Sequence, residues 1–194
     1  MLPGLLVLLA VLAGSVPTGV LVARAAGVDL RKVGSGNIGA TNVARALGKG
    51  WAGFVLLCDA LKGFLPVWTA RHLLPDTAPA IVAAAGLGTI VGHMFTIFLR
   101  GRGGKGVATS LGVALALSPL AALCGFGLYV LAYAVLRLSS VGSLLGIWSF
   151  PVFATVLGGL PRPYLYLATF VAILVTIRHR QNIARLIRGE EKKA

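Results

Sequence analysis

Residues 100–110 read Arg-Gly-Arg-Gly-Gly-Lys-Gly-Val-Ala-Thr-Ser and stand directly between two apolar runs. Four glycines, three fixed cations and two hydroxyl side chains fall within these eleven residues. Glycines without a Cβ let successive backbone N–H groups converge on one point, which makes a concave anion site. A helix that begins at Val107 would direct its positive N-terminal end to the same point. The stretch predicts a phosphate cradle at the membrane edge, and the alternative is a basic turn that only orients two membrane helices.

The rest of the chain is apolar enough to lie in a membrane. Of its 194 residues, 57% are hydrophobic and 12% are charged, which excludes an ordinary soluble domain. A helix needs about 20 apolar residues to cross a hydrocarbon layer of about 30 Å. We therefore expect an all-α integral membrane protein, with a single polytopic domain over residues 1–194. The predicted spans are residues 2–23, 51–73, 78–99, 107–118, 119–136, 141–160 and 163–178.

The distribution of Lys and Arg predicts how these spans are oriented. Cytoplasmic loops of membrane proteins carry an excess of cations. Here cations follow the first, third, fifth and seventh runs, whereas Arg71 and Arg162 fall in the opposite loops. Arg102 and Arg137 lie on the same side only if the chain between them crosses twice, so the fourth and fifth runs are expected to be separate helices. The predicted topology has seven transmembrane helices, with the N-terminus outside and the C-terminus in the cytoplasm.

A second polar segment lies between the first two apolar runs. Residues 34–45 read Gly-Ser-Gly-Asn-Ile-Gly-Ala-Thr-Asn-Val-Ala-Arg. Glycine and serine there are typical of a turn and a helix cap. Thr41 and Arg45 are one helical turn apart, and they remain polar, as do Asn37 and Asn42, in a segment bounded by membrane. We expect a second polar wall of the same site, and a capped turn is the alternative.

Further polar residues are expected on the same side. The carboxyl-terminal segment has apolar side chains at helical spacing and predicts a short interfacial helix. His179 and Asn182 follow the last span and are placed to face a site, and Ser143 lies near the start of the sixth span. His93 lies within the third span, where a polar side chain is costly and often functional. A packing role for this histidine is the alternative.

Acidic residues are scarce, with five Asp and Glu against 18 Lys and Arg. No carboxylate cluster is available for Mg²⁺ or Zn²⁺, so we predict no metal and no cofactor. Asp59 and Lys62 are one helical turn apart and predict an ion pair inside the second span. The net charge of +13 fits either an anionic lipid surface or an anionic substrate. Nucleic acid is not an expected partner, because no soluble recognition module is present.

Several stretches together resemble one protein family nearly end to end. They are Gly-Ser-Val-Pro-Thr-Gly at 14–19, Gly-Ser-Gly-Asn-Ile-Gly-Ala-Thr-Asn at 34–42, Asp-Ala-Leu-Lys-Gly at 59–63, Gly-His-Met-Phe at 92–95, Gly-Gly-Lys-Gly-Val-Ala-Thr at 103–109, Ser-Ser-Val-Gly-Ser at 139–143 and Asn-Ile-Ala-Arg-Leu at 182–186. The chain resembles the bacterial acyl-phosphate:glycerol-3-phosphate acyltransferases (PlsY). The resemblance implies transfer of a fatty acyl group from acyl phosphate to the 1-hydroxyl of sn-glycerol 3-phosphate. The products are lysophosphatidic acid and phosphate, in phospholipid biosynthesis.

The same resemblance implies a setting, and the polar and cationic residues on this side lead to a hypothesis for the site. The enzyme would lie in the bacterial cytoplasmic (inner) membrane, with its active site on the cytoplasmic face, and would meet transiently a soluble phosphate acyltransferase that makes the donor. The expected catalytic residues are Ser35, Arg45, Lys105, His179 and Asn182. The expected substrate-binding and phosphate-binding residues are Asn37, Thr41, Asn42, His93, Gly103, Gly104, Gly106, Thr109 and Ser143.

Two questions remain open at the level of sequence. The base that takes the hydroxyl proton is either a histidine or a phosphate oxygen of the donor. An organophosphate transporter that uses the same cradle is the alternative function. Transporters usually bind substrate near the bilayer midplane and contain repeated halves, whereas the distinctive motifs here crowd one face and show no repeat.

Overall fold

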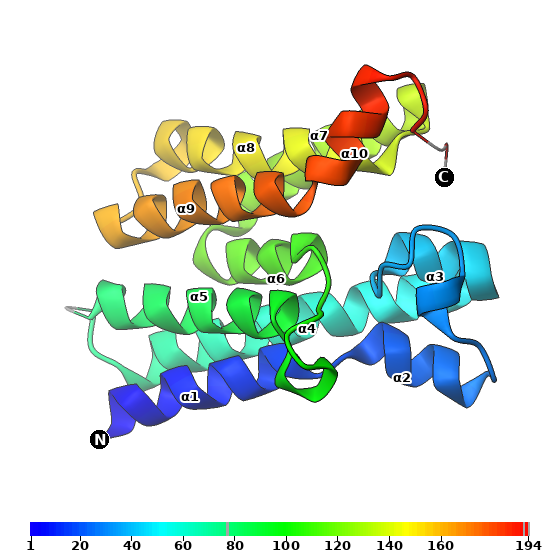
Figure 1. The fold of residues 1–194 in the computed structure, drawn as a ribbon. Coiled ribbons are helices and arrows are strands. Elements are labelled where there is room, and N and C mark those ends of the chain that lie inside the picture. The colour runs from blue at the N-terminus through cyan, green and yellow to red at the C-terminus, as the bar shows by residue number, and fades with distance from the viewer. Residues whose placement is uncertain (77, 192, 194) are drawn as a thin grey trace.

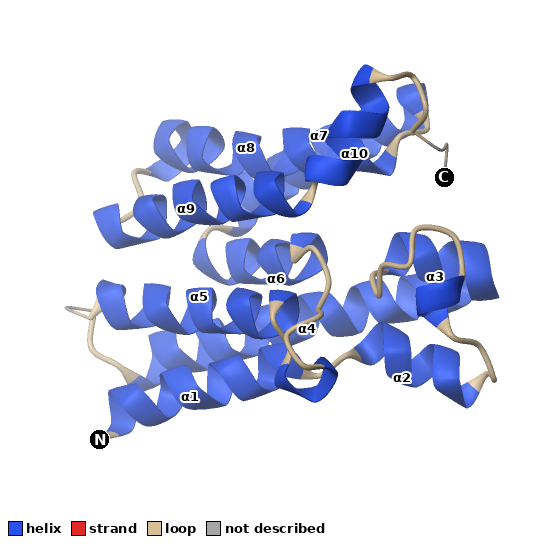
Figure 2. Ribbon diagram, viewed as in Figure 1, coloured by secondary structure: helices blue, strands red, loops and turns tan. Residues whose placement is uncertain are grey.

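A computed structural model describes residues 1–76, 78–191 and 193, which form helices and no strand (Figure 2). The long helices lie side by side in a stack, and the N-terminus lies at the end opposite α2, α3 and α10 (Figure 1). The α-helices are α1 (Leu2–Ser15), α2 (Thr18–Ala25), α3 (Ala40–Leu47), α4 (Lys49–Leu73), α5 (Pro79–Met94), α6 (Val107–Leu117), α7 (Pro119–Leu136), α8 (Ser139–Gly158), α9 (Arg162–Arg178) and α10 (Arg180–Ile187). Short 3-10 turns, η1 (Leu30–Lys32) and η2 (Ile97–Leu99), follow α2 and α5.

Several helical stretches are long and apolar enough to cross a bilayer, and they make the protein a multi-pass membrane protein. They are Leu2–Ala25, Lys49–Leu73, Pro79–Leu99, Pro119–Leu136 and Ser139–Gly158. Two other predicted spans are shorter. At about 1.5 Å per residue, α6 with 11 residues and α9 with 17 residues fall short of the hydrocarbon thickness of about 30 Å. The seven-span count stays a prediction.

The predicted span over residues 2–23 corresponds to the apolar helical stretch Leu2–Ala25, which is divided into two helices. α1 and α2 are separated by Val16 and Pro17, and proline has no N–H with which to continue a helix. Lys62 Nζ donates to the carbonyl oxygen of Val16 at 2.7 Å, so the break is held from α4. The same ammonium lies 2.8 Å from Asp59 Oδ1, which confirms the predicted ion pair.

The predicted separation of the fourth and fifth runs is confirmed. α6 ends at Leu117, and Ser118 is extended (φ −151°, ψ 90°) before α7 begins. Arg71 Nη1 donates to the carbonyl oxygens of Ala116 at 2.5 Å and Leu117 at 3.4 Å. Because the last carbonyls of a helix lack intrahelical donors, this guanidinium caps α6. Arg71, which lies on the side opposite most of the cations, therefore has a structural role at the end of α6.

α6 lies at the centre of the stack and is locked against α4 (Figure 1). A Cβ at Gly112 would lie 1.8 Å from the carbonyl oxygen of Ala60, and one at Gly63 would lie 2.1 Å from that of Thr109. Neither position tolerates a larger side chain, since both clashes are with backbone. The close contact fixes where α6 begins, beside the polar end of the molecule.

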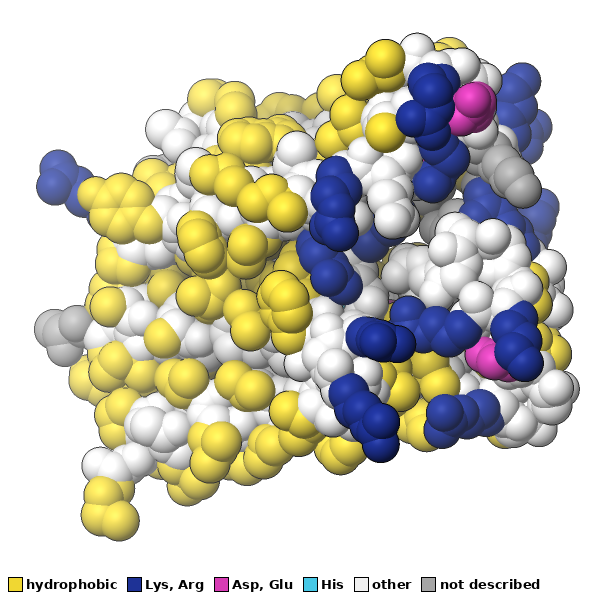
Figure 3. Space-filling view, in the orientation of Figure 1, with side chains coloured by type: hydrophobic (Ala, Val, Ile, Leu, Met, Phe, Trp, Pro, Cys, Tyr) yellow, Lys and Arg dark blue, Asp and Glu magenta, His cyan; other side chains and the backbone are white. Residues whose placement is uncertain are grey.

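Basic side chains gather at that end. In Figure 3, Lys and Arg cover the side of the molecule that carries α2, α3 and α10, while hydrophobic side chains cover the stacked helices. Such a separation is typical of membrane proteins whose loops on one side carry an excess of Lys and Arg.

Candidate functional site

A cavity of about 260 Å³ lies where the beginnings of α6 and α8 meet α3, α10 and the loop before α3. It brings together most of the residues predicted for the site. Those that line it are Ser35, Asn37, Thr41, Asn42, Arg45, His93, Lys105, Gly106, Ser143, His179 and Asn182. Three predicted residues, Gly103, Gly104 and Thr109, do not line it, although all belong to the glycine-rich stretch or to the helix that follows it.

The loop before α3 is organised by one buried side chain. The amide nitrogen of Asn42, which is 1% exposed, lies 2.9–3.1 Å from the carbonyl oxygens of Leu30, Val33 and Asn37. Its oxygen accepts the N–H of Ser35 at 3.0 Å. The side chain of Asn42 thus holds Ser35 and Asn37 at the edge of the cavity. Its predicted contact with substrate stays a prediction, because its donors and acceptor already have partners.

The glycine-rich loop is held by partners outside itself. The N–H groups of Gly103 and Gly104 donate to the carbonyl oxygens of Met94 and His93, each at 3.1 Å. Arg178 Nη2 donates to the carbonyl oxygens of Gly103 at 3.1 Å and Gly104 at 2.8 Å. These two N–H groups cap the end of α5, so they do not form the expected part of a phosphate cradle in this structure.

Lys105, by contrast, extends to the cavity and joins a network that reaches the carboxyl-terminal segment. Its Nζ donates to Asn182 Oδ1 at 2.5 Å, and Asn182 Nδ2 donates to Glu191 Oε1 at 2.5 Å. The same carboxylate accepts from Arg185 Nε at 2.7 Å and from Ser140 Oγ at 3.0 Å. The sequence motifs did not indicate a site role for Glu191, Arg185 or Ser140. The sequence feature that could have indicated this role is the position of Glu191 just after the cationic helix α10, in a chain with few acidic residues.

The electrostatics of this network favour an anionic ligand. Burial, together with the charges of Arg185, Arg45 and Arg178, lowers the pKa of Lys105 to about 8 against the opposing effect of Glu191. Burial alone would raise the pKa of Glu191, but the hydrogen bonds that it accepts outweigh burial and lower the pKa. Arg45, Lys105 and Arg185 thus line the same cavity as the carboxylate of Glu191. An incoming phosphate would relieve their mutual repulsion.

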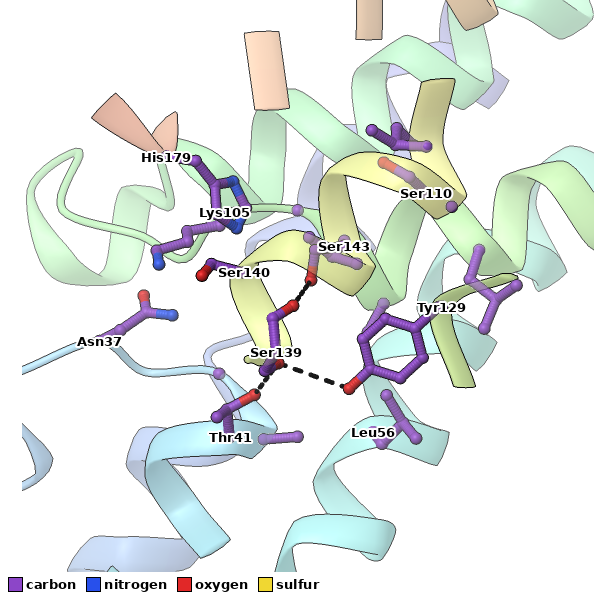
Figure 4. A pocket seen from close by; sticks show the side chains of 18 of the residues that line it. Asn37, Thr41, Leu56, Lys105, Ser110, Tyr129, Ser139, Ser140, Ser143 and His179 are labelled. Atoms are coloured by element: carbon purple, nitrogen blue, oxygen red, sulfur yellow. Dashed lines mark hydrogen bonds between the residues drawn. The ribbon is translucent and has the colours of Figure 1, made fainter. Parts of the chain in front are cut away.

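His179 presents an unprotonated ring nitrogen to the cavity. Its Nδ1 lies 2.8 Å from the carbonyl oxygen of Val175, and because a carbonyl only accepts, Nδ1 carries the proton. Burial and the charge of Lys105 lower the pKa of His179 to about 4, so the ring is neutral near neutral pH. Figure 4 shows His179 beside Lys105, with Ser140 and Asn37 nearby. Nε2 therefore carries no proton and can accept a proton or a hydrogen bond.

A row of hydroxyl groups borders the cavity on the other side. Ser139 Oγ lies 3.1 Å from Thr41 Oγ1 and 3.4 Å from Tyr129 Oη, and Ser143 Oγ donates to the carbonyl oxygen of Ser139 at 2.7 Å (Figure 4). The row ties α3 to α7 and α8. Beyond it the lining becomes apolar, with Leu111, Ala114, Ala122, Phe126, Ile147 and Phe150.

The fold and site define a class: a multi-pass membrane protein with a cationic, hydrogen-bonding mouth that continues into an apolar crevice, suited to a phosphate-bearing amphiphile. The comparison with known proteins is more specific. Residues 4–189 match the family model described as glycerol-3-phosphate acyltransferase. The chain therefore belongs to this family.

Relatives and solved structures agree over nearly the whole length. Glycerol-3-phosphate acyltransferases of Anaeromyxobacter sp. (strain K) and Rubrobacter xylanophilus are both 48% identical to this chain, cover 100% of it, and are themselves covered to 98% and 96%. A crystal structure of PlsY (YgiH), an integral membrane glycerol 3-phosphate acyltransferase in its glycerol 3-phosphate form, superposes with a TM-score of 0.96 at 40% identity, over 100% of this chain and 96% of that one. The lysophosphatidic acid form gives 0.93 at 39% identity, over 100% and 95%.

Proposed function

We propose that this protein is a membrane glycerol-3-phosphate 1-O-acyltransferase that takes its acyl group from acyl phosphate and releases lysophosphatidic acid and phosphate. Family membership supports the acyltransferase activity, and the two ligand forms of the solved relative support the substrate and the product. The observation that carries the proposal is the single cavity that joins cations and amides at its mouth to an apolar crevice. An acyl phosphate has the same two parts.

Two phosphate groups must share the mouth of the cavity. Two dianions about 6 Å apart repel by roughly 11 kcal/mol at an effective dielectric constant of about 20. Arg45, Lys105 and Arg185 line the mouth and supply opposing charge. Val107 and Ala108 also line it, and N–H groups in the first turn of a helix lack intrahelical acceptors. These groups hold the reactants together, which converts a bimolecular step into one within a complex.

The reaction follows from this placement. The 1-hydroxyl oxygen of glycerol 3-phosphate attacks the acyl carbonyl carbon, and the bond from that carbon to the phosphate oxygen breaks. The hydroxyl proton ends on the released phosphate. Nε2 of His179 is a protein atom placed to accept it on the way, and a phosphate oxygen of the donor is the other acceptor. His179→Gln decides between them: a protein base would be lost with most of kcat, whereas a donor phosphate would leave much of kcat in place.

The proposed topology places this chemistry at the cytoplasmic face of the bacterial inner membrane, with seven spans in one domain and the N-terminus outside. The donor would arrive at the basic end from a soluble phosphate acyltransferase. Single cysteines test the topology after Cys58 and Cys124, which are free thiols, are replaced by alanine. A membrane-impermeant maleimide should label a cysteine at Ser118 in intact cells, and one at Gly189 only after permeabilisation. The reverse pattern would overturn the orientation.

The activity is tested with purified protein, palmitoyl phosphate and labelled glycerol 3-phosphate. We expect labelled lysophosphatidic acid with palmitoyl phosphate and none with palmitoyl-CoA, and Lys105→Ala should lower kcat/KM by at least about 100-fold. Uptake of label into proteoliposomes without lysolipid would instead indicate an organophosphate transporter. The absence of both lysolipid product and uptake would reject both functions.

A further inference from the structure

The apolar part of the cavity is a crevice between α6, α7 and α8 that closes at one depth. α6 contributes Ala114, α7 contributes Ala122 and α8 contributes Phe150 to its lining. These three side chains are 8%, 2% and 6% exposed, and all belong to one hydrophobic cluster, which Ala154 and Ala168 also join. Because α7 follows α6 after the turn at Ser118, these residues meet as the closed end of the crevice, which we name the floor.

The crevice is shorter than a long fatty acyl chain. Gly106 before α6, Tyr129 on α7 and Ser139 on α8 line its mouth. At about 1.5 Å per helical residue, the floor lies about 11–17 Å from the mouth. An extended hydrocarbon advances about 1.25 Å per carbon, from a bond of about 1.52 Å at a near-tetrahedral angle. The crevice therefore accommodates roughly 8–13 carbons before the chain reaches the floor.

A second, smaller cavity adjoins the crevice on the side of α9. It has a volume of about 20 Å³ and extends toward Leu167 and Val171 on α9. Ser110, Ala114, Ile147 and Phe150 line both cavities, so these side chains form the partition between them. Phe150 has the largest side chain of the four. Removing its ring would join the two spaces.

We propose that Phe150 determines acyl-chain length by closing the crevice, an inference that rests on the proposed function. The occupant is the acyl chain of the substrate, because the crevice is continuous with the phosphate-binding mouth and most of its lining side chains beyond the row of hydroxyl groups are apolar. An acyl chain that is shorter than the distance from the mouth to the floor is buried over its full length. Further methylenes meet the Phe150 ring and must leave the crevice.

The test compares kcat/KM for saturated acyl phosphates of increasing length, from decanoyl to stearoyl. Phe150→Ala should raise the ratio for stearoyl over dodecanoyl by about tenfold, the lower end of what one methylene contributes in a hydrophobic pocket. Ala114→Leu should lower that ratio by a similar factor. Phe170→Ala is the matched control, since it removes the same ring from a side chain that is 48% exposed on α9 and lines neither cavity.

The outcomes separate this inference from the proposed function. Opposite shifts in Phe150→Ala and Ala114→Leu, with no shift in Phe170→Ala, would support it. An active wild type whose length preference changes less than twofold in both variants would overturn it. A wild type inactive with every chain length would overturn the proposed function itself. Should Phe150→Ala fail to fold, Phe150→Leu provides a smaller opening with the same expected direction.

Discussion

Two glycine-containing loops border the cavity, residues 33–39 and 100–106, and they are held in different ways. The first is tied by Asn42, whose partners all lie within 12 residues of it. The second is tied by Arg178, whose partners lie 74–84 residues away. Arg31 connects the loops by donating to the carbonyl oxygens of Gly36 and Arg102.

Glycine has a different role in each loop. A Cβ at Gly34 would lie 2.4 Å from Asn42 Oδ1, and the residue has a φ of +56°. Glycine here therefore leaves room for the Asn42 side chain that holds the loop. A Cβ at Gly104 would lie 2.2 Å from His93 Nε2, so glycine there admits a side chain from α5. The first loop is a local structure. The second depends on the packing of α5 and α9.

We expect the largest effect from removing the local tether. Asn42→Ala would leave several carbonyl oxygens and one N–H near a buried position without their partners, at about 1–3 kcal/mol for each unsatisfied group. Activity should fall by at least about 100-fold, and thermal unfolding of the purified protein should occur at a lower temperature. Unchanged kinetics would mean that the loop holds its shape without this side chain.

A smaller effect is expected from the remote tether. Arg178→Lys keeps the charge but loses the planar fork that contacts Gly103 and Gly104. Because the loop carries Lys105 into the cavity, KM for glycerol 3-phosphate should rise about 10-fold while kcat changes less. Arg188→Lys is a control, since Arg188 pairs with the exposed Glu190 outside the cavity. Equal losses in both variants would contradict the role given to Arg178.

The contact between Gly104 and His93 can be tested by a double-mutant cycle. Gly104→Ala should cost about 1–3 kcal/mol of stability through overpacking. Gly127→Ala should cost little, because nothing lies within 4 Å of a Cβ there. Adding His93→Ala should make Gly104→Ala less harmful, with a coupling energy of at least about 0.5 kcal/mol. Strict additivity would mean that the clash is relieved elsewhere.

The smallest predicted effect is on pH dependence. The pKa of Lys105 is lowered to about 8, so its charge is present below that pH and is lost as pH rises through it. kcat/KM should therefore fall above about pH 8, and Lys105→Arg should remove that limb if it retains activity. His179 has a pKa lowered to about 4 and should add no limb between pH 6 and 8. A limb near pH 6.5 that disappears in His179→Gln would contradict this assignment.

How far the sequence predicts this molecule depends on how local each interaction is. The long apolar runs predicted membrane helices, because their apolar side chains must be buried in lipid or protein. The excess of cations at one end predicted how these helices are oriented. The break at Val16–Pro17 was hidden by the same apolar composition. The loop at Ser35–Asn37 was predicted in its polar character, because Asn42, which holds it, is close in sequence.

The rest of the site required the tertiary structure. Glycine at 103 and 104 indicated a close approach, but the sequence did not show that the approaching groups are the end of α5 and the guanidinium of Arg178. Glu191 received no site role from the sequence, although it binds Asn182 and Arg185 beside the cavity. Such contacts join segments whose order in the chain says nothing about their distance. The absence of a metal stays a prediction.

The claim that two phosphate groups occupy one mouth is tested most directly by equilibrium binding of labelled glycerol 3-phosphate in the presence of a non-cleavable acyl phosphonate. We predict that wild-type protein binds both ligands at once, and that Lys105→Ala or Arg45→Ala weakens glycerol 3-phosphate binding by at least about 10-fold. Mutual exclusion of the two ligands, or unchanged affinity in both variants, would contradict it.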